Sequence, residues 1–169
     1  MTTRQCGDCS ACCYTHGVEE INKPKYTACA QQCISGGCLI YQQKPDSCTR
    51  FECAWHEGII GNEEHRPDIT GLVFWSMHPS NWRRGFKTLS VIEGEDDAHL
   101  TPQGQAFIKN VLSQGWVLLL RSRTTEPMLQ YHINRAVPGI EYLVEELVDA
   151  SYMVQTVNIP LVQTELVSV

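Results

Sequence analysis

The chain has no apolar run of about 18 residues, the length that a membrane-spanning helix needs, so we expect no membrane span. Residues 1–5 contain no apolar segment of the kind found in signal peptides. Lys and Arg number 13 against 19 Asp and Glu, and the resulting net charge of −6 argues against a nucleic-acid-binding face. We therefore expect a cytoplasmic protein whose partner, if it has one, is another protein or a larger assembly.

The sequence also lacks a phosphate-binding glycine loop, an H-E-x-x-H helix and a G-x-S-x-G elbow. Its 169 residues, 43% of them hydrophobic, can bury the core of one domain. Large aliphatic residues are scarce over residues 1–66 and common afterwards. This contrast predicts an α+β protein: a cysteine-rich, metal-stapled N-terminal subdomain (1–66), a body with a small mixed sheet and two helices (67–155), and an extended tail or edge strand (156–169).

Cysteine is absent after residue 53, and all nine cysteines lie between Cys6 and Cys53. In a reducing compartment such thiols bind metal, and the odd count also weighs against a disulfide scaffold. Residues 6–13 have the spacing C-x2-C-x2-C-C, in which two intervening residues let two sulfurs reach one ion. The adjacent Cys12 and Cys13 diverge, so they either serve two ions or divide into one ligand and one buried thiol. The same opening is similar to the start of a ferredoxin run, which leaves an iron–sulfur cluster as an alternative.

The later cysteines have their own local signals. Gly36 and Gly37 precede Cys38 and would let the backbone approach a metal closely or form a hairpin. Residues 48–55 are expected to be helical, and in a helix Cys48 and Cys53 would need a bend to meet at one ion. The same helix would place Phe51 and Trp55, four residues apart, on one face.

The segment from Cys6 to Trp55 resembles the zinc- and iron-chelating CxxCxxCC cysteine-cluster family (YkgJ-like). The resemblance rests on the C-x2-C-x2-C-C opening, on Cys29, on C-L-I-Y from Cys38, and on K-P-x2-C-x-R-F-x-C-x-W over residues 44–55. It implies a small bacterial or phage metal-binding domain with no settled biochemical activity. Carried over residue by residue, it implies eight metal ligands, namely Cys6, Cys9, Cys12, Cys13, Cys29, Cys38, Cys48 and Cys53.

The segment departs from the family pattern at three positions. Lys44 stands where the family usually has arginine, Gln32 stands where it often has an apolar residue, and Cys33 is an extra thiol outside the pattern. Eight thiols suit two zinc sites of four thiolates each, one cluster plus one zinc, or a single ion with spare thiols. Zinc is therefore the expected cofactor, with iron or an iron–sulfur cluster as the alternative.

Histidines offer one further ligand. His56 follows Cys53 with C-x2-H spacing and could replace a cysteine, although the thiols already suffice. His65 is interpreted as part of a boundary loop. The other histidines are scattered and are interpreted as surface or core-edge residues, namely His16, His78, His99 and His132.

The body shows strand and helix patterns in alternation. Four strands are expected, at residues 71–75, 87–92, 116–120 and 128–133. The unbroken apolar run 116–120 predicts the central strand. Thr101 and Pro102 predict the start of a helix that ends at Gly115.

A second helix is expected after Gly139, with a buried stripe of Ile140, Leu143, Val144, Leu147 and Val148. Between the second strand and the first helix, residues 93–97 are expected to form an acidic turn. Pro160 restricts the tail to an edge strand or an extended arm.

Two charged features outside the cysteines have alternative interpretations. Trp82, Arg83 and Arg84 could touch an anion or RNA, but without a wider basic patch a solvated loop is favoured. Five acidic residues and no Lys or Arg follow Ala136, which suits either a docking surface for a basic partner or the solvent face of a helix.

Three functions fit these patterns. The first is a non-enzymatic module in which structural zinc shapes the N-terminal segment for partner contacts or assembly. The second is an iron–sulfur redox or electron-transfer protein, and the third is a metal-chelating or trafficking protein. A catalytic thiol is disfavoured, because only Cys33 is left free by the pattern and no histidine lies close to it in sequence.

Overall fold

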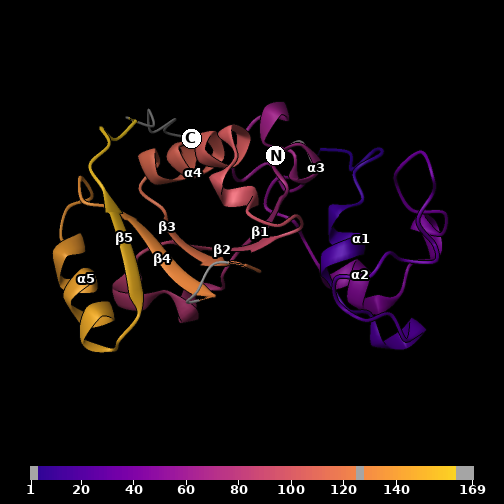
Figure 1. Ribbon diagram of the computed structural model, residues 1–169, viewed down its shortest axis with the longest axis horizontal. Coiled ribbons are helices and arrows are strands. Elements are labelled where there is room, and N and C mark those ends of the chain that lie inside the picture. The colour runs from indigo at the N-terminus through magenta and orange to yellow at the C-terminus, as the bar shows by residue number, and fades with distance from the viewer. Residues whose placement is uncertain (1–3, 125–127, 163–169) are drawn as a thin grey trace, which may run out of the picture.

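The computed structural model describes residues 4–124 and 128–162, and its largest element is a five-stranded sheet with the order β1-β2-β3-β4-β5 (Figure 1). The strands are β1 (Leu72–Ser76), β2 (Thr88–Glu93), β3 (Val117–Arg121), β4 (Leu129–Asn134) and β5 (Met153–Val157). The pairs β1–β2 and β3–β4 are antiparallel, whereas β2–β3 and β4–β5 are parallel. The α+β class with a mixed sheet is confirmed, and the apolar run that begins at Val117 is the central strand.

Two helices connect the parallel strands and cover opposite faces of the sheet. Helix α4 (Pro102–Ser113) links β2 to β3, and α5 (Ile140–Asp149) links β4 to β5. Because the two parallel pairs run in opposite directions, right-handed crossovers place their helices on opposite faces. Side-chain alternation agrees with this: Leu118 belongs to the core beneath α4, and its neighbour Val117 belongs to the core beneath α5.

The termini of α4 follow its sequence signals. The Thr101 hydroxyl accepts a hydrogen bond from the backbone N–H of Gly104 at 3.0 Å, and Pro102 occupies the first turn. The helix ends at Ser113, two residues before Gly115, whose φ is +78°.

Helix α5 buries four of its five expected core residues. Ile140, Leu143, Val144 and Leu147 are at most 9% exposed, but Val148 is 55% exposed, so the prediction is wrong there. Val148 lies about 80° around the helix from Ile140, at the margin of the stripe.

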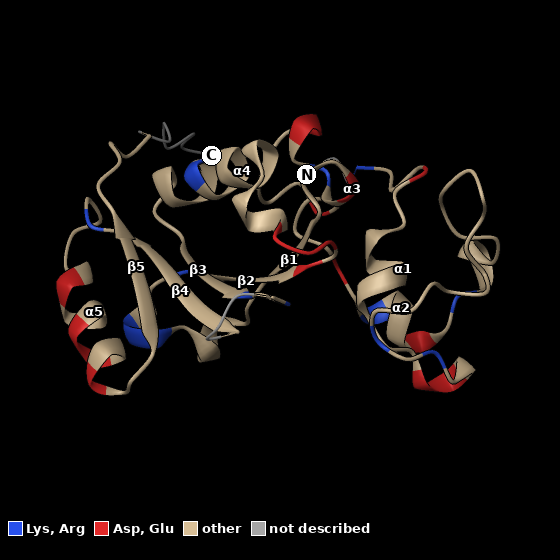
Figure 2. Ribbon diagram, viewed as in Figure 1, with Lys and Arg blue, Asp and Glu red and all other residues tan. Residues whose placement is uncertain are grey.

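The basic turn beside α5 has an intramolecular partner. Arg83 and Arg84 bind the Glu146 carboxylate at 3.0 and 2.7 Å, so that the turn lies against the foot of the helix (Figure 2). Part of the acidic surface of α5 is thereby paired within the chain. Glu165, the last of the acidic residues after Ala136, lies outside the described residues.

Strand β5 forms one edge of the sheet and begins at Met153, before the expected tail boundary at residue 156. Pro160 follows the strand, as its missing N–H requires. After β5 the chain returns to α4, where the N–H of Val162 donates to the Ser113 carbonyl at 2.9 Å. No helix in residues 4–124 and 128–162 has the length and apolar character to span a membrane.

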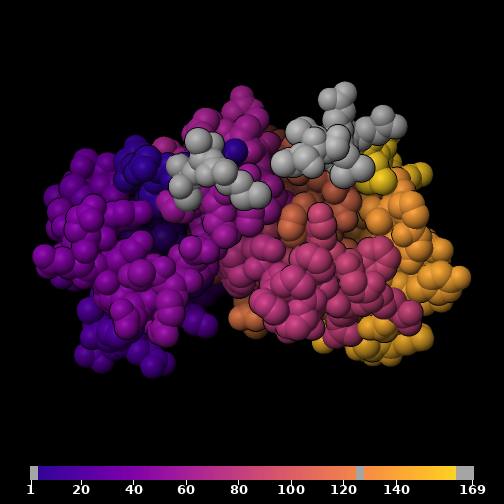
Figure 3. All heavy atoms as spheres, turned by 180° about the vertical axis from the view of Figure 1, so that it is seen from behind, coloured from indigo at the N-terminus to yellow at the C-terminus, as the bar shows by residue number. Residues whose placement is uncertain are grey.

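Residues 4–53 form a lobe at one end of the molecule, beside the β1 end of the sheet (Figures 1 and 3), whereas Trp55 and Ile60 already belong to the core beneath α4. Its regular structure is short, and the α-helices there and at its junction with the sheet are α1 (Ala11–Thr15), α2 (Asp46–Arg50) and α3 (Pro67–Thr70). Single 3-10 turns complete the structure, at Glu19–Ile21, Tyr41–Gln43, Glu63–His65, Pro79–Asn81, Arg83–Gly85 and Ala98–Leu100. Within residues 4–53, Val18 is the only hydrophobic residue that belongs to the buried core.

The expected helix over residues 48–55 is wrong in extent, because α2 ends at Arg50. The N–H of Ala54 donates to the Phe74 carbonyl of β1 at 2.9 Å, a tertiary bond that replaces the helical one. Phe51 therefore does not share a helical face with Trp55: it packs on His16, whereas Trp55 is 2% exposed in the core beneath α4.

The guanidinium of Arg4 binds three backbone carbonyls in the segment that begins at Trp55. Arg4 donates to the carbonyls of Trp55, Ile60 and Gly61 at 3.1, 3.3 and 2.7 Å. Its guanidinium carbon also lies 5.3 Å from the centre of the Trp55 ring. These bonds fasten the start of the lobe to the segment that enters the sheet.

The acidic turn expected over residues 93–97 begins later than predicted. Glu93 is the last residue of β2, and its carboxylate is fully buried. That carboxylate accepts from the Ser122 hydroxyl and the Arg123 N–H, each at 2.8 Å, and lies 2.5 Å from His99 Nδ1. His99 and His132 are 2% and 6% exposed, so their interpretation as surface or core-edge residues is wrong. For His99 the reason is that the buried carboxylate supplies a polar partner for its imidazole inside the core.

The polar cluster around Glu93 makes the first prediction. Changing Glu93→Ala leaves buried donors without an acceptor, so we expect the free energy of unfolding to fall by about 3 kcal/mol. The exposed neighbour Glu95 is the matched control, for which Glu95→Ala should change that energy by less than about 0.5 kcal/mol. Urea denaturation of both variants measures the difference, and equal losses would contradict the assignment.

The same carboxylate predicts a pH dependence. Burial acts to raise the pKa of Glu93, but hydrogen bonds from His99, Arg123 and Ser122 outweigh it and hold that pKa below its usual range. The contribution of the carboxylate is therefore complete above the unfolded-state pKa of about 4.3 and is lost as the pH falls through the lower folded-state value. The difference in unfolding free energy between wild type and Glu93→Ala should shrink on acidification through that range.

Candidate metal centre

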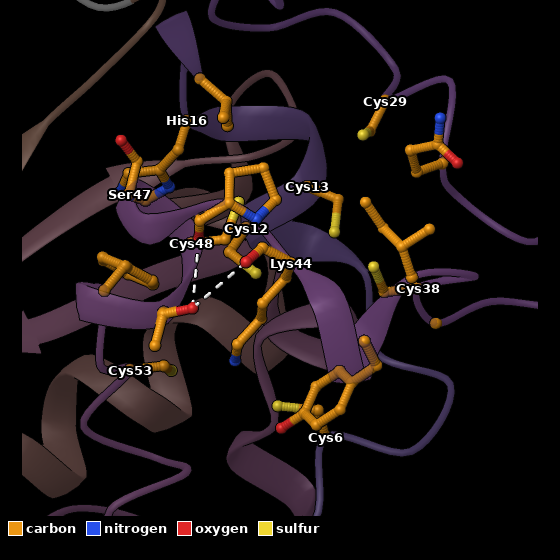
Figure 4. Close-up of a pocket in the computed structure, with 18 of the residues that line it drawn as sticks. Cys6, Cys12, Cys13, His16, Cys29, Cys38, Lys44, Ser47, Cys48 and Cys53 are labelled. Atoms are coloured by element: carbon orange, nitrogen blue, oxygen red, sulfur yellow. Dashed lines mark hydrogen bonds between the residues drawn. The ribbon is translucent and has the colours of Figure 1, made fainter. Parts of the chain in front are cut away.

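A cavity of about 290 Å³ lies in the N-terminal lobe, between α1, α2 and the loops that join them (Figure 4). Eight of the nine cysteines line it, namely Cys6, Cys9, Cys12, Cys13, Cys29, Cys38, Cys48 and Cys53. Cys33 is not among the lining residues. The eight thiols that the family resemblance singled out are thus brought to one cavity.

Two short helices supply three of these thiols. Cys12 and Cys13 lie in α1, and Cys48 lies in α2. Because α2 ends at Arg50 and the chain then turns extended at Phe51, Cys53 returns to the same cavity. The bend thus brings Cys48 and Cys53 to the same cavity, and a meeting at one ion stays a prediction.

The other thiols come from turns that the glycines allow to pack closely. The N–H of Cys9 donates to the Cys6 carbonyl at 2.9 Å and closes a turn. Gly36, with φ +94°, lies so close to this turn that an added Cβ would stand 2.3 Å from the Asp8 carbonyl oxygen. What the glycines approach here is the backbone of residues 7–8, which sets Cys38 beside the first turn, and the expected close approach to a metal stays a prediction.

The adjacent thiols of α1 have opposite pKa shifts. The Cys12 thiol donates a hydrogen bond to the Cys13 sulfur, which raises the pKa of Cys12 well above its usual value, and burial raises it further. Accepting that bond lowers the pKa of Cys13 to about 7.

Burial governs most of the remaining thiols. It raises the pKa of Cys9 to about 12 and also raises the pKa values of Cys6, Cys48 and Cys53. Several thiolates in one partly buried cavity would repel one another, so a bound cation is the natural means of ionising them at neutral pH.

The donor set suits a soft, thiolate-binding metal, but the side chains are not drawn together into a coordination sphere. Within the described ranges, no group of three or more His, Cys, Asp or Glu side chains is placed to hold a metal ion. The sulfurs would have to move inward to reach zinc–sulfur distances of about 2.3 Å. The fit therefore rests on the number and chemistry of the donors that share the cavity.

Sequence reasoning missed several residues of this cavity. His16 lines it, and burial lowers the pKa of His16 to about 4, so the imidazole is neutral near pH 7 and can act as a nitrogen donor. Lys23 also lines it and is only 8% exposed, with its ammonium donating to the carbonyls of Tyr14 and Pro24. The sequence around Lys23 reads as a surface connection, so only the folded chain identifies this cation. His56, the alternative ligand, lies at the cavity as well.

The ninth thiol has a different setting. Cys33 Sγ lies 3.1 Å from the Ser35 hydroxyl, and this hydrogen bond lowers the pKa of Cys33. Cys33 is thus set apart from the other cysteines by position as well as by sequence pattern.

Comparisons with family models, with curated proteins and with solved structures found no match to this chain. The resemblance to the CxxCxxCC family accordingly stays a prediction.

The glycine contact predicts how the cavity can be opened. In Gly36→Ala the new Cβ would collide with the Asp8 carbonyl, and backbone atoms cannot yield cheaply. We expect at least about tenfold faster amide hydrogen exchange at Cys33 and Leu39, whose N–H groups bond to Gly37 and Gln31 carbonyls.

The control is Gly85→Ala, where φ is also positive at +76° but nothing lies within 4 Å of the added Cβ. It carries the backbone strain of about 1–2 kcal/mol without the collision, and exchange in the lobe should be unchanged. Identical exchange in both variants would show that the close approach of Gly36 does not shape the lobe.

Proposed function

We propose that this protein is a metal-binding cysteine-cluster protein, in which zinc held by thiolates shapes the N-terminal lobe and the α+β body serves partner contacts or assembly. The observation that carries the proposal is the shared cavity: eight of the nine cysteines line it and Cys33 does not. Zinc suits such a donor set because it favours closed tetrahedral sulfur sites and brings no redox chemistry.

The energetics of the lobe support the same proposal. Residues 4–53 contribute only Val18 to the buried hydrophobic core, and their regular elements are single turns or five-residue helices. Apolar burial therefore offsets little of the entropy lost when these residues are ordered. Thiolate–zinc binding contributes about 10–16 kcal/mol in small zinc domains, enough to supply the difference.

The electrostatic contacts suggest how the thiols divide between two ions. Cys12 interacts with Cys6 and Cys9, and Cys53 interacts with Cys6. This gives a first set of four thiols, namely Cys6, Cys9, Cys12 and Cys53.

A second set is centred on α2. Cys48 interacts with Cys13, Cys29 and Cys38, which together make four thiols. In this division the adjacent Cys12 and Cys13 would serve different ions, although Cys13 also interacts with Cys12 and Cys6.

An iron–sulfur redox protein is the second candidate, since two sets of four cysteines also suit clusters. The ferredoxin-like opening of residues 6–13 favours it specifically. A chelating or trafficking protein would use the same thiols with weaker, exchangeable binding. The metal and the rate of its exchange, not the ligand set, separate these three functions.

Metal content and the visible spectrum of protein purified without oxygen test the proposal directly. We expect about two zinc ions per chain and no visible absorption, whereas a cluster would absorb visible light. A rapid loss of zinc to a weak chelator would favour trafficking. Protein that contains neither zinc nor iron, yet keeps an ordered lobe, would overturn the proposal.

Single cysteine variants test the ligand set. Cys38→Ser should lose about one of two metal ions, because serine is a poor zinc ligand, and Cys9→Ser should do the same at the other site. Combining the two changes should remove both ions. Cys33→Ser is the matched control, five residues from Cys38, and should keep the full metal content by elemental analysis.

Two results would be incompatible with this assignment. Full metal retention in Cys38→Ser would remove that thiol from the ligand set. Loss of both ions in either single variant would replace two separate sites by one shared centre.

Metal affinity should fall with falling pH. The pKa of Cys9 is raised to about 12 and that of Cys53 is also raised, so both thiols hold their protons until a metal displaces them. Each displaced proton weakens apparent affinity about tenfold per pH unit on acidification. Competition with a chromophoric chelator at several pH values measures this slope, and a pH-independent affinity would rule out thiol ligands.

A further inference from the structure

A second cavity, of about 270 Å³, lies between the N-terminal lobe and the sheet. Its floor is the face of the sheet that carries α5, at the end where α5 does not reach. Ile92, Leu119 and Leu129 supply aliphatic side chains there from three adjacent strands. The lobe closes the other side with Lys25 and Tyr26.

The charge of this cavity is opposite to that of the whole protein. Lys25 and Arg121 line it, and among the residues that the structure describes no aspartate or glutamate does, although the chain carries a net charge of −6. The ion pairs formed within residues 4–124 and 128–162 involve neither of these two cations. Two cations above an apolar floor would complement an anionic group attached to an apolar body.

Aromatic rings complete the lining and one of them is held in place. Trp75 lines the cavity from β1 and Tyr26 from the lobe. The Tyr26 ring lies 4.7 Å from the Arg123 guanidinium carbon and 6.1 Å from the centre of the Tyr14 ring. Tyr26 also has a positive φ of 55°, an unfavourable conformation for a side chain of this size that is enriched at binding sites.

We propose that this second cavity binds a small organic anion, an aromatic carboxylate in class. The carboxylate is held by Arg121 and Lys25, and the ring packs on Trp75, Tyr26 and the aliphatic floor. The volume is just below the 300–1,000 Å³ of cavities for drug-sized ligands, which limits the ligand to a small molecule. The site takes one wall, with Lys25 and Tyr26, from the N-terminal lobe and so needs that lobe to be ordered, and His16 lines both cavities.

Benzoate is the probe, titrated into the full chain as purified with its metal and followed by calorimetry and by amide NMR shifts. We expect chemical-shift changes at the amides of Trp75 and Leu119, because both residues line the cavity. Benzamide, the neutral analogue, should bind at least about tenfold more weakly, because it lacks the charge that the cations recognise. Inorganic phosphate should also bind at least about tenfold more weakly, because it lacks the apolar ring.

Arg121→Gln should weaken benzoate binding about tenfold, since it removes a charged donor from an exposed position that the fold tolerates. Arg135→Gln is the matched control, because Arg135 is exposed directly after β4 but does not line the cavity. Should Arg121→Gln fail to fold, Lys25→Gln makes the same test from the lobe, with Lys109→Gln as its control.

The proposal is overturned if benzoate gives neither heat nor shifts at about 10 mM, far above a useful affinity. It is also overturned if benzamide or phosphate binds as tightly as benzoate, or if the cavity variants bind as their controls do. If protein that is purified without zinc or iron still binds benzoate, the metal proposal alone is rejected, so the two proposals can fail separately.

Discussion

The mutual repulsion that eight ionised thiols would exert, in a space with little apolar filling, is the constraint on any metal binding by the N-terminal lobe. Between residues 4 and 53 only Val18 joins the hydrophobic core, whereas eight thiols line one cavity. Burial keeps most of these thiols protonated in the absence of a cation, as the raised pKa of Cys9 illustrates. A cation in that cavity would convert the repulsion into the main source of cohesion. The sheet half of the protein has no such need, because its two cores are built from aliphatic side chains.

The sheet half was predictable where local signals and burial agree. The cap at Thr101, the stripe of α5 and the apolar run of β3 each gave the observed element, because hydrophobic periodicity decides such segments. The sequence could not reveal the burial of Glu93, since an acidic residue before Gly94 reads as part of a turn. Only the folded chain brings His99 and Ser122 around that carboxylate.

The candidate site shows the same division between pattern and tertiary structure. Cysteine spacing and the family resemblance selected the eight thiols that share a cavity and left out Cys33. Cysteine spacing could not place His16 or Lys23 at that cavity. Contacts with residues distant in sequence bring His16 there, and hydrogen bonds to backbone carbonyls hold Lys23. The helix predicted through Cys53 failed for a related reason: the bond from Ala54 to β1 outweighs local helix propensity.

The hydrogen bond from Ala54 to Phe74 also joins two parts of the protein with different interiors. Cys53 faces the sulfur-lined cavity, and the next residue, Ala54, is fully buried in the core beneath α4 with its N–H on the outermost strand β1. Together with the hydrogen bonds of Arg4, the bond of Ala54 thus links the N-terminal lobe to the sheet half of the protein. Cys53 and Ala54 are joined by one planar peptide unit, so a ligand residue of the proposed metal site lies directly beside the hydrogen bond that anchors the lobe to an edge strand of the sheet.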